Sequence, residues 1–432
     1  MRVVKVGFLG FGNIGSGVYQ VLRDNADLIE HRDGLRFEVK RMLVRDVNKS
    51  RKFMVGTKLT TDVADIAGDP EIEFVCEFMG GIHPAREYIL EVLKAGKTVI
   101  TANKQVLANC WPELQAAAQE SGAGLYFEAS VAGGIPIIRT MWDSIQANHI
   151  DSIMGIINGT TNYILTRMTE EGLSYEEVLE SAQKLGLAEP DPTSDVEGYD
   201  AMYKLSILGS MGFHTRLPID VIYHEGITKV TKEDIAYGKE MGYTLKLLAI
   251  GKKRGNEVEA RVHPAFIPNT HPLASIRGAF NAVFMHGDAV GDLMLYGRGA
   301  GDLPTASAII SDLVYACHQD KHRYMTFKNQ PFLDPGTTIL EDWESEYYLH
   351  VKVVDKPGVL AKMTQIFADH EVSVASVFQK NTSAKEGSAS VVFVTHKTRE
   401  LAMKSVLKDL EAEADVLEIK NCIRVEEGEQ DA

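Results

Sequence analysis

The first third of the chain alternates strand-like and helix-like hydrophobic patterns. Residues 3–10 (VVKVGFLG) are rich in valine and alternate weakly, which predicts a buried strand. Further strand-like runs lie at 37–44, 73–81, 97–104 and 124–130, with helical runs at 84–95 and 111–121. Strands that alternate with helices indicate an α/β fold with a doubly wound parallel sheet over residues 1–136.

The pattern changes after residue 136. Between 137 and 300 the regular alternation fades into mixed strands and short helices, which indicates a second domain of the α+β class. A glycine-rich turn then leads into a helix at about 300–325, which we expect to complete the first domain. Residues 329–346 carry prolines, acids and little periodicity, and we interpret them as a linker.

The last part of the chain, 347–426, has its own regular order of elements. Strands are predicted at 347–354, 371–380, 388–396 and 415–425, and helices at 359–369 and 399–411. The turn between the first strand and the first helix is Asp355-Lys356-Pro357-Gly358. A βαββαβ order of this length predicts a small separate domain.

A glycine motif stands between the first strand and the first helix. It consists of Gly10, Phe11, Gly12, Asn13, Ile14 and Gly15. In this context the first glycine permits a tight turn, the second lets the backbone approach a pyrophosphate, and the third lets the helix pack on the strand. We therefore predict a Rossmann-type dinucleotide-binding domain.

The end of the 37–44 strand bears on the choice of cofactor. Arg45 comes first and Asp46 second, and Arg51 and Lys52 follow closely. An arginine suits the 2′-phosphate of NADP, whereas an acid at this place bonds the ribose of NAD. The pattern favours NADP, and Asp46 keeps NAD open.

Other candidate residues follow later strands, where function collects in such sheets. Thr101 and Lys104 follow the 97–104 run, and Lys104 could face the nicotinamide or be a surface lysine. Glu128 opens the loop EASVAGGIP, whose carbonyls could hold a hard cation, although a plain turn is the simpler alternative. Gly301 lies in a turn before a helix, where backbone could meet a phosphate or the nicotinamide edge.

The stretch 182–204 combines kinks with acids. Pro190 and Pro192 prevent a regular helix there. The carboxylates are Glu189, Asp191, Asp195, Glu197 and Asp200. In the helix-like run after Gly198, Asp200 and Lys204 are four residues apart and share one face. Such a pair could transfer protons on a small polar substrate, or it could be an ordinary surface ion pair.

Composition excludes several classes of function. A formal net charge of -15 argues against nucleic acid and against anionic membrane surfaces as partners. The chain has no apolar run of membrane-spanning length. Its four cysteines are scattered without a CxxC, which suits a reducing cytoplasm.

The 182–204 stretch closely resembles the homoserine dehydrogenase signature. The matching positions are Ala182, Gly186, Pro190, Asp195, Val196, Gly198, Asp200 and Lys204. GFGNIG, TANK (101–104), EASVAGGIP and NGTTNYIL are also similar to that family, so the resemblance covers roughly residues 1–325. The C-terminal unit resembles an ACT domain, a module that senses small molecules, through its D-K-P-G-V-L turn.

The resemblance implies a reaction and its catalytic residues. The reaction is the reversible, NAD(P)-linked interconversion of L-aspartate 4-semialdehyde and L-homoserine, on the route to threonine, methionine and isoleucine. Lys204 would be the proton donor and Lys104 a second lysine at the reacting oxygen. Asp200 would position substrate or a catalytic water, and Glu189 would bind the substrate's amino group.

Further sites and partners are implied by the same resemblance. Glu128 with the carbonyls of Val131, Gly133 and Ile135 would form a sodium site, and Gly301 would lie by the cofactor. The domain at 137–300 would bind substrate and pair subunits into a homodimer or homotetramer. We expect an amino-acid effector, with L-threonine favoured, beside the 355–358 turn at an interface between paired ACT domains.

Two alternatives remain open from the sequence. One is a dehydrogenase of another amino-alcohol on the same scaffold. The other is a non-catalytic sensor that binds NADP and an amino acid. The Asp200/Lys204 pair counts against the sensor, because a sensor needs no proton donor.

Overall fold

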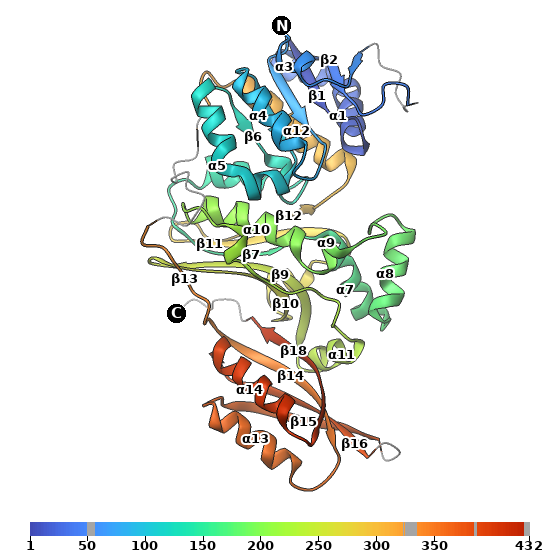
Figure 1. Cartoon of the computed structure of the whole chain (residues 1–432), viewed down its shortest axis with the longest axis vertical. Coiled ribbons are helices and arrows are strands. Elements are labelled where there is room, and N and C mark those ends of the chain that lie inside the picture. Colours follow the sequence, from blue (N-terminus) through green and yellow to red (C-terminus); the bar gives the residue numbers. More distant parts are fainter. Residues whose placement is uncertain (50–56, 323, 325–334, 384–386, 427–432) are drawn as a thin grey trace.

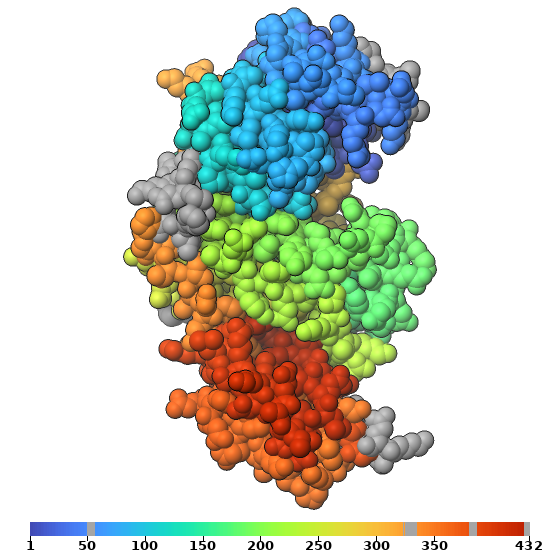
Figure 2. Space-filling view, viewed as in Figure 1, coloured from blue at the N-terminus to red at the C-terminus, as the bar shows by residue number. Residues whose placement is uncertain are grey.

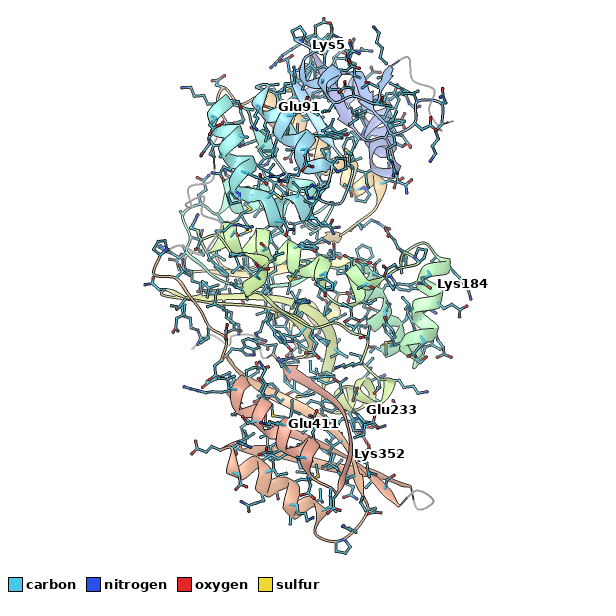
Figure 3. The ribbon with its side chains drawn as sticks, in the orientation of Figure 1. Lys5, Glu91, Lys184, Glu233, Lys352 and Glu411 are labelled. Carbon is cyan, nitrogen blue, oxygen red and sulfur yellow. The ribbon has the colours of Figure 1, made fainter. Side chains whose placement is uncertain are left out.

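The molecule consists of three lobes that follow one another along its long axis (Figure 1). The computed structural model describes residues 1–49, 57–322, 324, 335–383 and 387–426. The N-terminal and C-terminal lobes lie at opposite ends, and the space-filling view shows the same order (Figure 2). Charged side chains such as Glu91, Lys184 and Glu411 are exposed on the surface of the molecule (Figure 3). Among the described residues, no helix combines the length and apolar character needed to cross a membrane.

The N-terminal lobe is built on a parallel sheet with the strand order β3-β2-β1-β4-β5-β6. Its strands are β1 (Arg2–Leu9), β2 (Leu35–Leu43), β3 (Lys58–Thr60), β4 (Phe74–Glu77), β5 (Thr98–Thr101) and β6 (Leu125–Tyr126). The strand order reverses direction between β1 and β4, and ligands bind at such a switch point beyond the carboxyl ends of the strands. The predicted doubly wound sheet is confirmed.

Helices cover both faces of this sheet. They are α1 (Asn13–Asp24), α2 (Ala26–Asp33), α3 (Ala64–Ala67), α4 (Ala85–Lys94), α5 (Lys104–Ser121) and α12 (Asp302–Cys317). The late helix α12 packs closely against α1, because a Cβ built on Gly17 would lie 2.9 Å from the Asp302 carbonyl oxygen. The chain thus returns to the first lobe after passing through the second.

The start of α5 differs from the sequence prediction. We predicted a strand over 97–104 and a helix over 111–121, but β5 ends at Thr101 and α5 begins at Lys104. The Asn103 side chain caps α5 by accepting a hydrogen bond from the Val106 N–H at 3.1 Å. Pro112 lies inside α5, although a proline usually interrupts a helix.

The middle lobe contributes one half of a long mixed sheet, in the order β12-β11-β7-β9-β10. These strands are β7 (Ile150–Ile156), β9 (Tyr243–Arg254), β10 (Glu257–Pro268), β11 (Phe280–Gly287) and β12 (Gly291–Arg298), and β8 (Tyr223–His224) pairs with β10. The helices are α7 (Gly159–Glu171), α8 (Tyr175–Lys184), α9 (Thr193–Val196), α10 (Tyr199–Gly212) and α11 (Lys232–Glu240). Short helical turns are η1 (Glu128–Ser130), α6 (Ile137–Arg139), η2 (Thr140–Ser144), η3 (Ile219–Val221) and η4 (Pro272–Ser275).

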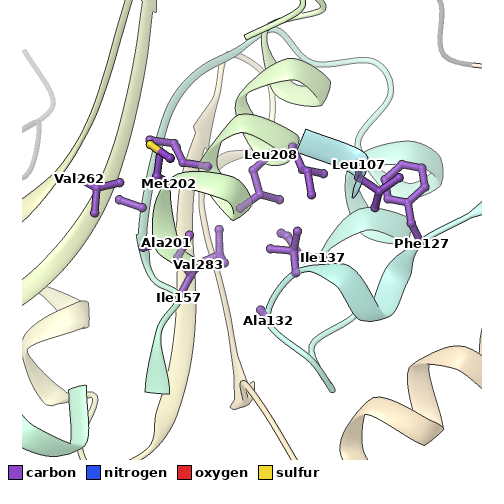
Figure 4. Packing of buried hydrophobic residues seen from close by; sticks show 14 of the residues in the cluster. Leu107, Phe127, Ala132, Ile137, Ile157, Ala201, Met202, Leu208, Val262 and Val283 are labelled. Atoms are coloured by element: carbon purple, nitrogen blue, oxygen red, sulfur yellow. The ribbon is translucent and has the colours of Figure 1, made fainter. Parts of the chain in front are cut away.

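The contact between the first two lobes is largely apolar. Leu107 of α5, Leu208 of α10 and Ile137 of the connecting segment belong to one buried cluster (Figure 4). Each of these three side chains is almost completely shielded from solvent. Burial of this kind stabilises the arrangement by roughly 1.5–3 kcal/mol per large aliphatic side chain. The cluster therefore holds α10 firmly against the carboxyl end of the parallel sheet.

The C-terminal lobe has the predicted βαββαβ order, with a short extra strand. Its elements are β14 (Glu344–Val354), α13 (Val359–Asp369), β15 (Val374–Ser383), β16 (Ser388–Thr395), β17 (Thr398–Arg399), α14 (Glu400–Ala412) and β18 (Val416–Val425). Strand β18 also pairs with β10 in parallel, through Ala265 with Arg424 and Phe266 with Val425. The sheets of the middle and C-terminal lobes are therefore one continuous sheet.

The linker expected at 329–346 is too long. Residues 329–334 lie outside the described residues, but β13 (Thr338–Ile339) pairs with β10, and β14 begins at Glu344. Trp343 between them is buried. A two-residue strand shows no periodicity, so the sequence pattern could not reveal this pairing.

Candidate active site

The glycine turn joins β1 to α1 at the switch point of the parallel sheet. Gly10 has a left-handed φ of 99°, and its N–H donates to the Leu43 carbonyl at 3.0 Å. Gly12 is exposed, and a Cβ built there would meet nothing within 4 Å. Gly15 is packed, because its Cβ would lie 3.1 Å from both the Gly10 carbonyl oxygen and the Phe78 ring. The turn thus combines a sharp bend, an open approach and close packing, as pyrophosphate binding requires.

The other members of the turn surround this open approach. Asn13 is exposed at the first position of α1, and Phe11 and Ile14 are half-buried. Arg45 is exposed just beyond β2, and the Asp46 carboxylate beside it accepts a hydrogen bond from the Asn48 N–H at 2.8 Å. Arg51 and Lys52 lie outside the described residues. An exposed guanidinium at this edge of the sheet fits an anionic group on a dinucleotide.

The turn after β5 is held by a buried hydroxyl. Thr101 is fully buried, and its hydroxyl donates to Glu77 at 2.5 Å and accepts from the Asn103 N–H at 3.0 Å. Asn103 also donates to the Gly81 carbonyl at 2.8 Å. The predicted cofactor residue Thr101 therefore uses its hydroxyl within the protein. Lys104 follows directly as the first residue of α5.

Three side chains from two lobes meet at the centre of the site. Lys104 Nζ lies 2.9 Å from Asp200 Oδ1, and Lys204 Nζ lies 2.6 Å from Asp200 Oδ2. Lys204 also donates to the Ile157 carbonyl at 2.8 Å. Asp200 and Lys204 are almost fully buried, whereas the Lys104 side chain is 37% exposed. The pair predicted from spacing is thus a buried pair joined by a second lysine, and not a surface ion pair.

The helix that carries Asp200 and Lys204 starts where the prolines end. Gly198 has a left-handed φ of 86° and precedes α10 directly. The sequence excluded a regular helix around Pro190 and Pro192, and the structure shows a single turn, α9, immediately after Pro192. This turn and Gly198 together set the direction in which α10 enters the site.

Asn158 links the trio to a further acid, and sequence reasoning did not single it out. Its amide donates to Asp200 Oδ2 at 2.9 Å and to Asp195 Oδ1 at 2.7 Å. Its own oxygen caps α7 by accepting from the Thr161 N–H. Asn158 opens the NGTTN motif, directly before α7. An asparagine at a helix start was the available signal.

Electrostatic effects in this cluster follow from burial and from the two lysines. Burial alone would raise the pKa of Asp200, but Lys204 and Lys104 overcome it and hold that pKa below its usual value. The Asp200 charge in turn raises the pKa of Lys104 against the effect of burial. Burial and the neighbouring Asp200 raise the pKa of Asp195. The site therefore combines an ionised carboxylate, Asp200, with a partly exposed charged amine, Lys104, and with a second acid, Asp195, whose pKa is raised.

Two further predicted residues lie at the edges of this cluster. Glu189 is exposed in the loop before α9, and its charge contributes to the raised pKa of Lys104. Gly301 is exposed, has a φ of 121° and directly precedes α12.

The Glu128 loop is a buried acidic structure. Glu128 accepts hydrogen bonds from the Ile138 and Arg139 N–H groups at 2.9 and 2.8 Å. Its N–H donates to Asp312, whose other oxygen lies 2.5 Å from Arg139. Burial and the Asp312 charge raise the pKa of Glu128 to about 7. Among the described residues, no cluster of three His, Cys, Asp or Glu side chains has the arrangement of a metal site.

The turn predicted to bind an effector lies on the outside of the C-terminal lobe. Asp355, Lys356, Pro357 and Gly358 are all exposed. Gly358 has a left-handed φ of 93° and directly precedes α13. Lys356 Nζ lies 2.5 Å from Asp415, which also pairs with Lys362 at 2.8 Å. The turn is thus an exposed helix start anchored by ion pairs.

The fold and this cluster define a nicotinamide-dependent oxidoreductase that acts on a small polar substrate. Family models agree: homoserine dehydrogenase matches residues 136–314, its NAD-binding domain matches 10–128, and an ACT domain matches 347–415. The homoserine dehydrogenase of Bacillus subtilis (strain 168) is 40% identical over 431 residues, 99% of each chain. That of Corynebacterium glutamicum is 39% identical and covers 98% of this chain and 96% of its own.

Solved structures give the same result. A homoserine dehydrogenase from Thiobacillus denitrificans has a TM-score of 0.91 at 40% identity, covering 99% of both chains. The S. aureus enzyme at pH 7.5 has a TM-score of 0.76 at 32% identity, covering 98% of this chain and 99% of its own. A hyperthermophilic archaeal homoserine dehydrogenase in complex with NADPH shares the fold, with a TM-score of 0.61 at 24% identity over 74% of this chain and 100% of its own.

The chain belongs to the homoserine dehydrogenase family and carries a C-terminal ACT domain. It is an NAD(P)-dependent oxidoreductase of amino-acid biosynthesis that interconverts L-homoserine and L-aspartate 4-semialdehyde. The catalytic interpretation is therefore supported, and the non-catalytic sensor is not.

Proposed function

We propose that Lys204 donates the proton in aldehyde reduction, with Lys104 and Asp200 arranging the reacting oxygen. The observation that carries this proposal is the single carboxylate shared by the two lysines at 2.9 and 2.6 Å. A dinucleotide held by its pyrophosphate at the glycine turn would supply the hydride from its nicotinamide. The aldehyde oxygen then takes up a proton from the Lys204 ammonium, and the partly exposed Lys104 stabilises the developing negative charge.

Positioning of the substrate falls to the surrounding acids. A substrate with an ammonium group needs a carboxylate nearby, and Glu189 is the exposed acid next to the Lys104 side of the site. Asp200 keeps both ammonium groups in place, and Asn158 keeps Asp200 in place. We expect Glu189→Gln to raise the KM for L-homoserine at least tenfold and to lower kcat less than threefold. A fall in kcat as large as the rise in KM would contradict this role.

NADP is the proposed cofactor. Support comes from the exposed Arg45 at the end of β2 and from the NADPH found in the archaeal relative. The residues proposed to contact it are Gly10, Phe11, Gly12, Asn13, Ile14, Gly15 and Gly301. Arg45→Ala should raise the KM for NADP at least tenfold while changing that for NAD less than twofold. A similar change for both nucleotides would rule out 2′-phosphate recognition.

A sodium ion fits the Glu128 loop by charge. Two buried carboxylates, Glu128 and Asp312, face one guanidinium there, and the raised pKa values of both acids indicate that a cation at this place would be favourable. The loop also holds consecutive left-handed residues, Ala132 and Gly133, and such strain at a buried alanine often marks a functional turn. The carbonyls of Val131, Gly133 and Ile135 would complete an oxygen ligand set.

The melting temperature in different salts tests this cation site. NaCl should raise the melting temperature more than choline chloride of equal concentration, and Glu128→Gln should abolish the difference. Equal effects of the two salts on the wild-type protein would exclude a sodium site.

Feedback control by an amino acid is the proposed role of the ACT domain. The exposed turn at 355–358 offers backbone N–H groups at the start of α13, and L-threonine is the proposed effector. Gly358→Asn would place a side chain over these N–H groups, because a Cβ built there meets nothing within 4 Å and asparagine tolerates a left-handed backbone. We expect that variant to lose inhibition by threonine and to keep basal activity, whereas unchanged inhibition would place the effector elsewhere.

The assembly is proposed to be a homodimer or homotetramer in the cytoplasm. Strand β12 ends the long sheet and exposes Met294 and Tyr296, and the free cysteines suit a reducing compartment. Light scattering should give a multiple of the chain mass, and Tyr296→Lys should reduce it. A monomeric wild-type protein would contradict the proposal.

A direct absorbance assay tests the function as a whole. Reduced nicotinamide is followed with L-homoserine and NADP or NAD, with and without L-threonine. Homoserine-dependent reduction that is faster with NADP is the expected result. Absence of turnover with either nucleotide, in protein that binds NADPH, would overturn the proposed reaction.

A further inference from the structure

Glu77 is a fully buried carboxylate at the carboxyl end of β4. Within the described part of the chain it forms no ion pair, and burial raises its pKa. Its neighbours are hydrogen-bond donors instead. The Met79 N–H donates to one oxygen at 2.6 Å, and the Thr101 hydroxyl donates to the other at 2.5 Å. The Asn103 side chain and the Gly80 backbone also favour its charged form.

These donors belong to two loops that border the site. Met79 and Gly80 lie in the loop after β4, and Thr101 and Asn103 lie in the turn after β5. Gly80 and Gly81 both have left-handed φ values, 72° and 71°, and a Cβ on either would meet nothing within 4 Å. The first loop therefore presents open backbone beside the second turn, which leads directly into Lys104.

Hydrogen bonds run from Glu77 through Thr101 to Asn103, the residue before Lys104. Thr101 donates to Glu77 and accepts from the Asn103 N–H, and Asn103 caps α5. Lys104 is the residue after that cap, and its ammonium lies 2.9 Å from Asp200. A displacement of the turn would therefore move Lys104 relative to Asp200.

We propose that Glu77 is a positioning residue for the reaction, which fixes the Gly80–Gly81 backbone and the Lys104 ammonium relative to each other. This proposal rests on the proposed function of Lys104. A carboxylate suits the task because it offers only acceptors to the donors of both loops. An amide would turn its own N–H groups toward one of those donors. The start of the 18-residue helix α5 also favours an anion at this place.

The test is a double-mutant cycle in the full-length enzyme. Glu77→Gln and Thr101→Val each remove one side of the contact, and Thr101→Ser retains the hydroxyl. We expect each of the first two variants to lower kcat at least tenfold with the KM for L-homoserine changed less than threefold, because small displacements of a catalytic group reduce turnover. The loss in the double variant should be smaller than the product of the two single losses, because both variants break the Thr101–Glu77 contact. Thr101→Ser should recover kcat to within threefold of wild type.

A matched control separates positioning from general stability. Lys97 is buried at the other end of β5, where its ammonium donates to the Asp69 and Ile72 carbonyls at 2.6 and 2.8 Å. Lys97→Met should lower the melting temperature and leave kcat unchanged. Multiplicative losses in the double variant, or losses of kcat that only follow the melting temperature as in Lys97→Met, would overturn the proposal.

The remaining outcomes are also decisive. If Glu77→Gln does not fold, the comparison of Thr101→Val with Thr101→Ser carries the test, because both keep Glu77. If wild type does not oxidise L-homoserine, the proposed function fails. If wild type is active and Thr101→Val has the same kcat, only the positioning role of Glu77 fails.

Discussion

Lys104 and Lys204 approach opposite oxygens of one carboxylate, although they come from different lobes. Lys104 starts α5 of the dinucleotide-binding lobe and lies 2.9 Å from Asp200, whereas Lys204 lies on α10 of the middle lobe at 2.6 Å. The two lobes are joined at this point by the apolar cluster of Leu107 and Leu208. The contact between the two lysines and Asp200, which we propose to be catalytic, therefore depends on how the lobes are packed together.

Removal of the shared charge should change the pH dependence of the reaction. Asp200 raises the pKa of Lys104, so Asp200→Asn should lower that pKa. We expect the basic limb of the kcat/KM profile to move toward neutral pH, together with a fall in kcat/KM of about 100-fold. Asp191→Asn, at an exposed acid bonded to Thr193, is the control and should leave the profile unchanged. An unmoved basic limb in Asp200→Asn would contradict the coupling.

Two substitutions in the glycine turn should separate nucleotide binding from the stability of the fold. Gly12 has room for a side chain in the protein itself, so Gly12→Ala should change the free energy of unfolding by less than ~1 kcal/mol. The added methyl group would stand where the pyrophosphate approaches, and the Kd for NADPH should rise at least tenfold. Gly15→Ala should instead destabilise the fold by ~1–3 kcal/mol, because its Cβ meets Gly10 and Phe78. Equal nucleotide affinity in Gly12→Ala and wild type would refute the assigned site.

Lys246 makes stability depend on alkaline pH. It is 2% exposed on β9, its ammonium donates to Asn162 at 3.1 Å, and burial lowers its pKa from 10.5 to about 8. Between these two values the unfolded chain holds a proton that the folded chain has lost, so the free energy of unfolding rises with pH. The slope contributed by one such group approaches ~1.4 kcal/mol per pH unit.

Comparison with Lys246→Met isolates this contribution. Urea unfolding is measured at pH 7.5, 8.5 and 9.5. Between these pH values the free energy of unfolding should rise less, or fall more steeply, in Lys246→Met than in wild type. The exposed Lys239→Met should follow wild type. If the free energy of unfolding depended on pH in the same way in Lys246→Met and wild type, the lysine would titrate in the folded protein as it does in the unfolded chain.

The contact between the ACT domain and the middle lobe gives a route for control. Arg424 of β18 pairs with Glu225 at 3.0 Å and with Glu400 at 2.7 Å. Glu225 precedes Gly226, whose Cβ would lie 2.3 Å from the Val196 carbonyl oxygen, just before α10. A shift of β18 would therefore reach the helix that carries Asp200.

Glu225→Gln should weaken this coupling without damaging the site. We expect inhibition by L-threonine to need at least threefold more effector, with kcat in its absence unchanged. Glu411→Gln, at an exposed position on α14 (Figure 3), should respond as wild type does. If inhibition is unaltered in Glu225→Gln, the signal does not pass through this ion pair.

Local spacing explains which features the sequence could predict. The glycine turn, the Asp200/Lys204 pair and the βαββαβ order each lie within a short stretch, where periodicity and turn residues act directly. Asn158 and Glu77 were not predicted as site residues, because their partners Asp200 and Thr101 lie 42 and 24 residues away. The pairing of β4 with β5 brings Glu77 to Thr101, and the packing of helix α10 beside the start of α7 brings Asp200 to Asn158.

The remaining differences have similar causes. Strand β13 is too short for a periodic pattern, and its pairing with β10 depends on the completed sheet. The continuity of the sheet through β10 and β18 joins segments more than a hundred residues apart, as the Arg424–Glu225 bond also does. Helix α5 begins at the Asn103 cap and continues through an internal proline, Pro112, which usually interrupts a helical pattern.

The most direct test of the central claim is the single-turnover reduction of L-aspartate 4-semialdehyde by NADPH in Lys204→Met. The control is Lys184→Met, which disrupts an i,i+4 lysine–acid pair of the same spacing on the exposed helix α8, with Glu180 at 2.5 Å. Loss of a general acid lowers the rate by about 10²–10⁴-fold. We predict a loss of this size in Lys204→Met with an unchanged Kd for NADPH, and none in Lys184→Met. A rate in Lys204→Met within tenfold of wild type would contradict proton donation by Lys204.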